Sequence, residues 1–217
     1  MTDRFPYRHL IWDWNGTLLD DAYLCVDVMN ELMTSRGLGT MDATRYQTVF
    51  DFPVRDYYAG LGFDFSAEPF ETVSTEFITR YEARKMECPL RPGVRETLQA
   101  FAEAGVPQSL LSAAKQDYLD HILERHDLHG FFETVRGADD HHAHGKADKG
   151  RRLMADLALP EGAALMVGDT RHDAAVAEAM GADCWLLPGG HQSRARLAAC
   201  GVPVVEDLAA VRERAGV

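Results

Sequence analysis

Polar residues follow several short apolar runs of this sequence, and their side chains are of the kinds that transfer phosphoryl groups. They are Asp13, Ser112, Lys146, Asp169 and Asp173. A carboxylate can attack phosphorus, and further carboxylates can hold Mg²⁺, which prefers oxygen ligands. A hydroxyl and an ammonium group can stabilise the charge of the transferring group. The set therefore predicts metal-assisted phosphoryl transfer, provided that the fold brings these residues together.

Apolar runs and helical patterns alternate along the chain from about Arg91 onward. We expect strands at 106–112, 131–136, 163–167, 184–187 and 202–205, and helices at 94–104, 117–128, 150–159 and 173–180. This alternation, with one more strand at 9–12, predicts an α/β fold with a doubly wound parallel sheet and helices on both faces. Because such sheets carry their sites outside the carboxyl ends of the strands, the polar residues should meet at one rim.

Residues 20–90 interrupt the alternation. Helical patterns at 23–36, 43–50 and 70–85 flank an expected loop at 51–55, and we find no convincing strand pattern among them. Pro89, Pro92 and Gly93 mark the end of the segment. We therefore predict a smaller, all-helical cap domain over residues 20–90, inserted into a core formed by residues 1–19 and 91–217.

Composition excludes some classes of partner. The 217 residues are 46% hydrophobic, with 22 Lys+Arg against 34 Asp+Glu and a net charge of −12. This charge argues against nucleic acid or an anionic membrane as the main partner. No apolar run approaches the ~18 residues of a membrane span, no basic-then-apolar leader opens the sequence, and the four cysteines form no CxxC pair. We expect a cytoplasmic protein with reduced thiols, monomeric or homodimeric.

Four short motifs occur in the order found in the haloacid dehalogenase-like (HAD) hydrolase superfamily. The stretch 13–18, Asp-Trp-Asn-Gly-Thr-Leu, resembles the first motif, D-x-D-G-T after an apolar run. Ser112 and Lys146 resemble the second and third motifs, and 168–173, Gly-Asp-Thr-Arg-His-Asp, resembles the fourth, G-D-x-x-x-D. Together they span nearly the whole chain. With its helical insert, the chain is similar to the phosphoglycolate phosphatase-like members, which have a Rossmann-like core and a helical cap.

The resemblance implies a phosphatase that depends on Mg²⁺ and acts on a small phosphorylated metabolite. Asp13 would be the nucleophile, forming an aspartyl-phosphate, and also a metal ligand. The backbone carbonyl of Asn15 and the carboxylate of Asp169 would complete the protein ligands. Asp173 would bind the metal through water or orient Lys146.

The resemblance also implies which residues hold the substrate. Ser112 and Lys146 would bind the phosphoryl oxygens, and the neighbouring candidates are Gly16, Thr17 and Ala113. In the cap, Phe52 and Arg55 are candidates for recognising the rest of the substrate. A loop of this kind is more often a surface loop without a role in binding.

Two ambiguities concern the loop before the 150–159 helix. Lys149 competes with Lys146 as the lysine of the site, and we favour Lys146 because it follows Gly145 and lies nearer the end of the loop. The stretch 141–144, His-His-Ala-His, invites a zinc interpretation. Its spacing is tight and no cysteine or acidic partner completes it, so we interpret it as an exposed loop near the site.

Asn15 departs from the family pattern, in which the second Asp of the first motif protonates the leaving group and later activates water. An amide has no useful pKa for either task, although its backbone carbonyl can still bind metal. Losing general acid–base help costs ~10²–10⁴ in rate. The loss should be greatest for an alkyl phosphate and smallest for an activated leaving group.

Several explanations of Asn15 remain open. The protein could be a slow phosphatase, a related hydrolase that cleaves a phosphonate or a halide, or a binding module for a phospho-ligand or a protein with a disabled site. Deamidation of the Asn15–Gly16 dipeptide is a further hypothesis. A dehalogenase needs no metal, and a phosphonate-cleaving relative needs a cap lysine, for which Lys85 is the only candidate between residues 20 and 90.

Overall fold

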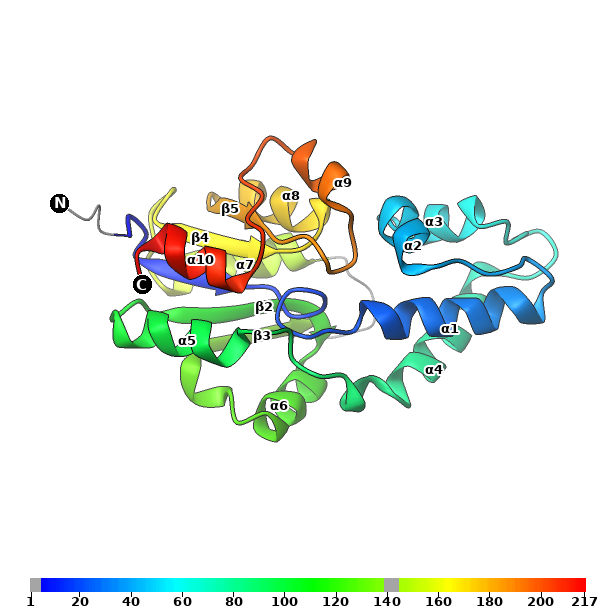
Figure 1. Cartoon of the computed structure of the whole chain (residues 1–217), viewed down its shortest axis with the longest axis horizontal. Helices are drawn as coiled ribbons and strands as arrows, with labels where there is room; N and C mark the ends of the chain where they lie inside the picture. The colour runs from blue at the N-terminus through cyan, green and yellow to red at the C-terminus, as the bar shows by residue number, and fades with distance from the viewer. Residues whose placement is uncertain (1–4, 139–144) are drawn as a thin grey trace.

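A five-stranded parallel sheet forms the centre of the molecule. The structure, a computed structural model, describes residues 5–138 and 145–217 (Figure 1). The strands are β1 (His9–Trp12), β2 (Gln108–Lys115), β3 (Thr134–Ala138), β4 (Ala164–Gly168) and β5 (Asp183–Leu186). Their order, β3-β2-β1-β4-β5, steps outward from β1 in both directions. The prediction of a doubly wound parallel sheet is thus confirmed.

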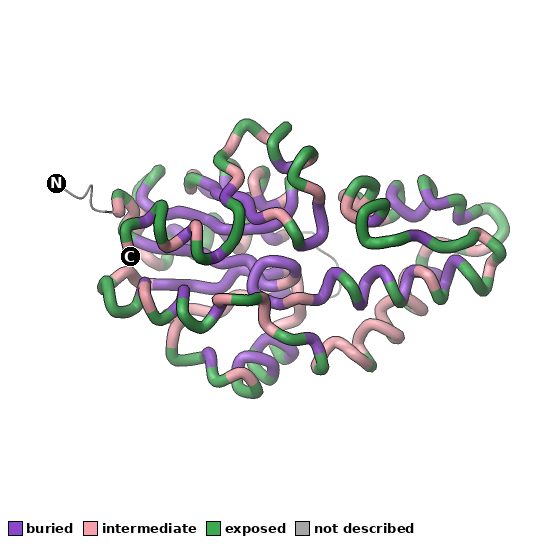
Figure 2. The backbone as a smooth tube through the Cα atoms, in the orientation of Figure 1, coloured by how far each residue is buried: buried purple, intermediate pink, exposed green. Residues whose placement is uncertain are grey.

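Helices cover both faces of this sheet because successive strand residues point to opposite sides. Leu10 and Trp12 of β1 belong to one hydrophobic cluster, whereas Ile11 between them belongs to another. The first cluster includes side chains of α5 (Val94–Glu103), α6 (Gln116–Arg125) and α10 (Leu208–Ala215). The second includes α7 (Lys146–Asp156), α8 (Arg171–Met180) and α9 (Arg194–Ala198). Figure 2 shows most of the strand residues between these layers in the colour of buried residues.

A lobe of helices extends from one end of the sheet (Figure 1). It contains α1 (Ala22–Ser35), α2 (Ala43–Val49), α3 (Val54–Gly60), α4 (Phe70–Glu82) and the short 3-10 helix η1 (Lys85–Glu87). Leu19 and Leu90 pair in an antiparallel bridge where the chain leaves the core and returns. Arg36 joins α1 to the loop before α4 and to α4 itself through ion pairs with Glu68 and Glu76, both at 2.7 Å. The division at residues 20 and 90 remains a prediction about domains.

Several element boundaries differ from the sequence expectations. The segment 51–55 was expected to be a loop, yet α3 begins at Val54, directly after Pro53. Proline is compatible with the start of a helix as well as with the segment after its end. Strand β2 continues past the apolar run to Lys115, which pairs with Ala138 of β3. Residues 202–205 form only a bridge between Val204 and Leu186. Within the described ranges, no helix is both long and apolar enough to cross a membrane.

Candidate active site

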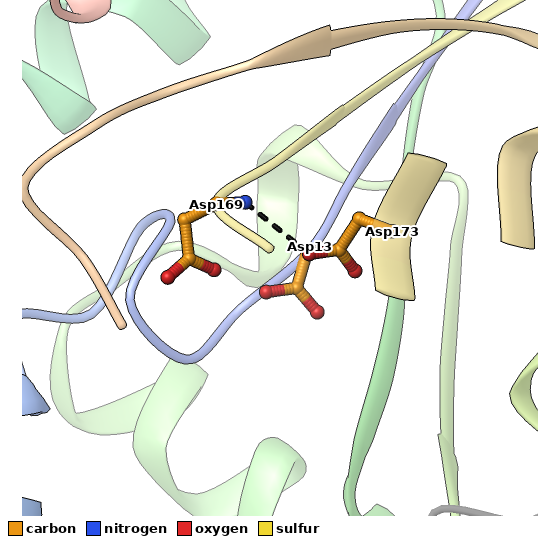
Figure 3. Close-up of side chains that lie close together, drawn as sticks. All are labelled: Asp13, Asp169 and Asp173. Atoms are coloured by element: carbon orange, nitrogen blue, oxygen red, sulfur yellow. Dashed lines mark hydrogen bonds between the residues drawn. The ribbon is translucent and has the colours of Figure 1, made fainter. Parts of the chain in front are cut away.

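Three buried carboxylates converge at the carboxyl ends of β1 and β4. Asp13 follows β1, Asp169 follows β4, and Asp173 lies in the first turn of α8 (Figure 3). One oxygen of each lies within 4.8 Å of the others. The expectation that strand ends would bring these residues together therefore agrees with their positions.

The position of Asp173 follows from the way α8 begins. Thr170 is the N-cap residue, and it forms a capping box with Asp173. One carboxylate oxygen, Oδ2, accepts hydrogen bonds from the hydroxyl of Thr170 at 2.7 Å and from the backbone N–H of Asp169 at 3.2 Å, the contact dashed in Figure 3. Asp173 is therefore not the N-cap itself, and its other oxygen is free of the helix terminus and faces the site.

Lys146 supplies the positive charge of this cluster. It is the first residue of α7, and its ammonium lies 2.5 Å from Oδ1 of Asp13 and 2.7 Å from Oδ1 of Asp173. The alternative, Lys149, instead donates to the backbone carbonyl of Gly137. Of the two lysines, the structure thus brings Lys146 to the carboxylates.

The charge balance of the cluster fits a divalent cation. The cluster has three carboxylates and one ammonium, which contacts Asp13 and Asp173. With these four groups ionised, two negative charges remain uncompensated in a buried place, which is costly. The ligand atoms offered are oxygens, which suit Mg²⁺. Asp13 and Asp169 would hold such an ion, whereas Asp173 is already bound to Lys146 and to the start of α8.

Burial raises the pKa of two of these three acids, Asp13 and Asp169. It raises the pKa of Asp13 to about 7, because Lys146 offsets the cost only in part and Asp173 and Asp169 add to it. Burial likewise raises the pKa of Asp169 to about 6, against the opposing charge of His191. For Asp173, burial is outweighed by Lys146, which holds its pKa below the usual range.

These shifts predict a pH-dependent effect of Mg²⁺ on stability. The carboxyls of Asp13 and Asp169 titrate near pH ~4 in an unfolded chain, so between there and about pH 7 these two groups bind more protons in the metal-free folded protein than in the unfolded one. Their contribution to stability should fall as pH rises through this window. Mg²⁺, which binds the ionised acids, should raise the melting temperature more at about pH 8 than at about pH 5. Equal gains at both pH values, measured by calorimetry, would contradict this.

Gly16 allows the turn after β1 to approach Asp169. Its φ is +74°, and a Cβ at this position would lie 2.2 Å from Oδ2 of Asp169 and 2.6 Å from Cδ2 of His191. The next residue, Thr17, has its hydroxyl 3.2 Å from Asp13 and 3.1 Å from Asp169. The turn therefore fits between the carboxylates of Asp13 and Asp169 because the residue at position 16 has no side chain.

Gly16→Ala is expected to lower the melting temperature and to disrupt the carboxylate cluster. Gly39→Ala is the matched control, since Gly39 also has a positive φ, +77°, but a Cβ there would meet nothing within 4 Å. Both variants pay the backbone cost of about 1–2 kcal/mol, whereas Gly16→Ala alone displaces Asp169. Chemical denaturation of both variants should show the larger loss at position 16, and equal losses would refute the steric argument.

The remaining candidates occupy different surroundings. Ser112 is buried inside β2, not after it, and its hydroxyl accepts from the backbone N–H of Ala114 at 3.0 Å; Ala113 lies between them. Phe52 lies with its ring 4.9 Å from that of His172, next to the fourth motif.

The contacts of Arg55 lie within the helical lobe. Arg55 lies on α3 with its guanidinium 5.1 Å from the ring of Phe65 and 3.8 Å from Glu71. Its predicted role in substrate binding stays a prediction. The histidines at 141–144 lie outside the described residues.

The site contains residues that the motifs did not indicate. The backbone N–H of His191 donates to Oδ2 of Asp169 at 2.6 Å, and its ring contacts the hydroxyl of Tyr46 in α2 at 2.9 Å. Asp21 lies buried beside Asn15 and His191. Although burial lowers it, the carboxylate of Asp21 raises the pKa of His191 to about 9. The strand-end rule could have found His191, because it follows β5 after a Gly-Gly pair.

Comparisons with known proteins agree with this geometry. Residues 10–187 match the family model described as haloacid dehalogenase-like hydrolase. A phosphoglycolate phosphatase of Pseudomonas savastanoi pv. phaseolicola (strain 1448A / Race 6) is 28% identical over 191 residues, which cover 84% of this chain and 70% of that protein.

Solved structures share the fold over almost the full length. A haloacid dehalogenase-like hydrolase from Streptococcus pneumoniae superposes with a TM-score of 0.81 at 17% identity, covering 96% of this chain and 98% of that one. The Protein Tyrosine Kinase A of Mycobacterium tuberculosis superposes with a TM-score of 0.80 at 25% identity, covering 98% and 99%. Each of these two matches covers both the sheet and the helical lobe of this chain.

Proposed function

Because this chain belongs to the haloacid dehalogenase-like hydrolase family, we propose that it is a Mg²⁺-dependent phosphatase for a small phosphate monoester. The observation that carries the proposal is the ammonium of Lys146, 2.5 Å from Asp13 in a cluster of three buried carboxylates. This arrangement offers a nucleophile, a cation for the substrate and oxygen ligands for a metal. Phosphoglycolate, the substrate in the name of the Pseudomonas relative, is one candidate substrate.

In the proposed first step, Asp13 attacks phosphorus as the P–O bond to the ester oxygen breaks, so that the alcohol leaves as its anion and an aspartyl-phosphate remains. Water then cleaves the aspartyl-phosphate, which releases phosphate and restores Asp13. Lys146 holds Oδ1 of Asp13, which leaves Oδ2 to form the new bond, next to the hydroxyl of Thr17. The ammonium also offsets repulsion between Asp13 and the incoming anion. Ser112, with the backbone around Ala113 and Gly16, would bind the phosphoryl oxygens. A bound Mg²⁺ would supply charge neutralisation between enzyme and phosphate.

Position 15 sets the range of substrates in this proposal. The side-chain N–H groups of Asn15 donate to Asp21 and to Tyr81, both at 2.8 Å, so this side chain is held away from acid–base work. A leaving group that departs as a stable anion needs no proton. We therefore expect aryl phosphates to react faster than alkyl phosphates, by a factor within the ~10²–10⁴ that an acid contributes.

A phospho-ligand-binding module is the second candidate. It is favoured by the hydrogen bonds of Asn15 to Asp21 and Tyr81, because a side chain held in this way supplies no acid for turnover. The halide-cleaving alternative does not explain the uncompensated carboxylates. For the phosphonate-cleaving alternative, Lys85 would have to act as a nucleophile, but its ammonium lies 3.9 Å from the centre of the Tyr118 ring and 3.0 Å from Glu82.

A phosphate-release assay separates the two candidates. The panel contains phosphoglycolate, glycerol phosphate and para-nitrophenyl phosphate, each measured with Mg²⁺ and with a chelator in its place. We expect metal-dependent release that is fastest for the aryl ester. If the protein binds phosphate but releases none from any ester, the result supports the binding module. If the chelator leaves the rate of phosphate release unchanged, the result contradicts the proposed dependence on Mg²⁺.

A further inference from the structure

Asp21 is a buried carboxylate that none of the four motifs contains. It precedes α1 in the position of an N-cap residue, yet its side chain makes no capping hydrogen bond to that helix. Both oxygens are used elsewhere, so its burial is not explained by the start of α1. The question is what this carboxylate holds.

One set of contacts joins Asp21 to the turn after the proposed nucleophile. Oδ1 accepts from the backbone N–H of Gly16 at 2.8 Å, and Oδ2 accepts from the side-chain amide of Asn15 at 2.8 Å. These contacts explain why an amide suits position 15, since it donates to the carboxylate. A second carboxylate at position 15 would face Asp21 across the same short distance and repel it.

A second set of contacts joins Asp21 to the helical lobe. The hydroxyl of Tyr81, on α4, donates to Oδ2 at 2.6 Å. The ring nitrogen Nε2 of His191 lies 3.4 Å from Oδ1, and the other ring nitrogen, Nδ1, lies 2.9 Å from the hydroxyl of Tyr46 in α2. Two separate helices of the lobe thus reach the same carboxylate, one directly and one through His191.

We propose that Asp21 is a positioning residue that sets the Asn15–Gly16 turn and couples its alignment to the seating of the helical lobe. The turn bears the carbonyl of Asn15 and the close approach of Gly16 to Asp169, so its displacement disturbs the proposed metal and phosphate sites. The inference rests on the proposed function for its kinetic consequence. The contacts themselves do not depend on the identity of the substrate.

The reciprocal exchange of the two side chains tests this proposal. Three variants are compared with wild type: Asp21→Asn, Asn15→Asp, and the double variant that carries both. Asp21→Asn faces one amide against another, and Asn15→Asp faces one carboxylate against another, whereas the double variant restores an amide donating to a carboxylate. Each single change should lower the melting temperature, and the double variant should recover most of the loss.

Kinetics distinguish positioning from a purely structural role. With para-nitrophenyl phosphate, whose leaving group needs no acid, Asp21→Asn should lower kcat at least about tenfold and change KM less. The double variant should regain most of kcat. Tyr81→Phe should lower kcat in wild type but add little in the Asp21→Asn background, because the two residues share one contact. Asp20→Asn, one residue away, is the matched control and should behave as wild type.

The outcomes separate the two proposals. Additive effects of Asp21→Asn and Asn15→Asp on both melting temperature and kcat would overturn the coupling, as would an unchanged kcat in Asp21→Asn. Should wild type release no phosphate from any ester, the proposed function fails. The melting-temperature cycle then still decides whether Asp21 and Asn15 act as a pair.

Discussion

Asp13→Asn is expected to abolish phosphate release, with a loss of at least about 10³-fold. The amide nearly matches the carboxylate in size but is too weak a nucleophile to form the covalent intermediate. The substitution also removes one of three crowded negative charges, so the melting temperature should not fall. Initial rates and calorimetry on the same preparation give both quantities.

Retention of more than a small fraction of the wild-type rate by Asp13→Asn would contradict a nucleophilic role. If Asp13→Asn had both a low rate and a strongly lowered melting temperature, the loss of activity would instead be due to unfolding. Asp20→Asn again provides a matched change of one acid to its amide, outside the carboxylate cluster, and should keep its activity.

Lys146→Met is expected to lower both activity and stability. The three carboxylates would lose their buried ammonium, and removing one partner of such a group costs up to about 3–5 kcal/mol. The loss of charge stabilisation for the transferring phosphoryl group should reduce kcat by at least about 10²-fold. Since Mg²⁺ also compensates the carboxylates, its addition should recover part of the stability but little of the rate.

Lys149→Met is the control for this prediction, because Lys149 lies one turn further along α7 and donates to the carbonyl of Gly137. It should retain most of the activity. An inactive Lys149→Met together with an active Lys146→Met would contradict our account, because it would show that Lys149 supplies the substrate-binding charge. Urea denaturation of both variants measures the difference in stability.

The sheet could be predicted from the sequence because its signal is local. A strand such as β4, Ala164–Gly168, is buried on both faces and is apolar almost throughout, which no surface element imitates. Boundaries were less accurate where pairing, not composition, extends a strand. At the end of β2, Ala113 and Ala114 carry no clear pattern, yet the backbone continues beside β3. The resemblance to the HAD superfamily is confirmed by the family match.

The candidate site could be predicted only where its residues belong to the motifs. Asp13 and Asp169 each follow a strand and Lys146 begins α7, and the structure places these three candidates together. Asp21 was missed because its contacts depend on how the Asn15 turn folds back and on Tyr81, 60 residues away in the chain. No spacing rule encodes such a tertiary contact.

The structure also changes the interpretation of Asn15. From the sequence alone, Asn15 was a missing acid. Because its amide lies 2.8 Å from Asp21, the single change Asn15→Asp should be unfavourable, and the residue is better understood as one half of a pair. The open alternatives of slow catalysis and a disabled site therefore depend on both positions.

The most direct measurement is mass spectrometry of protein quenched in acid shortly after mixing with para-nitrophenyl phosphate and Mg²⁺. Our account predicts that the peptide carrying Asp13 gains the mass of one phosphoryl group, and that Asn15, unable to activate water, lets this species accumulate. Asp13→Asn should show no such gain. Turnover by wild type with an unmodified Asp13 peptide, or with the phosphoryl group on another residue, would contradict the account.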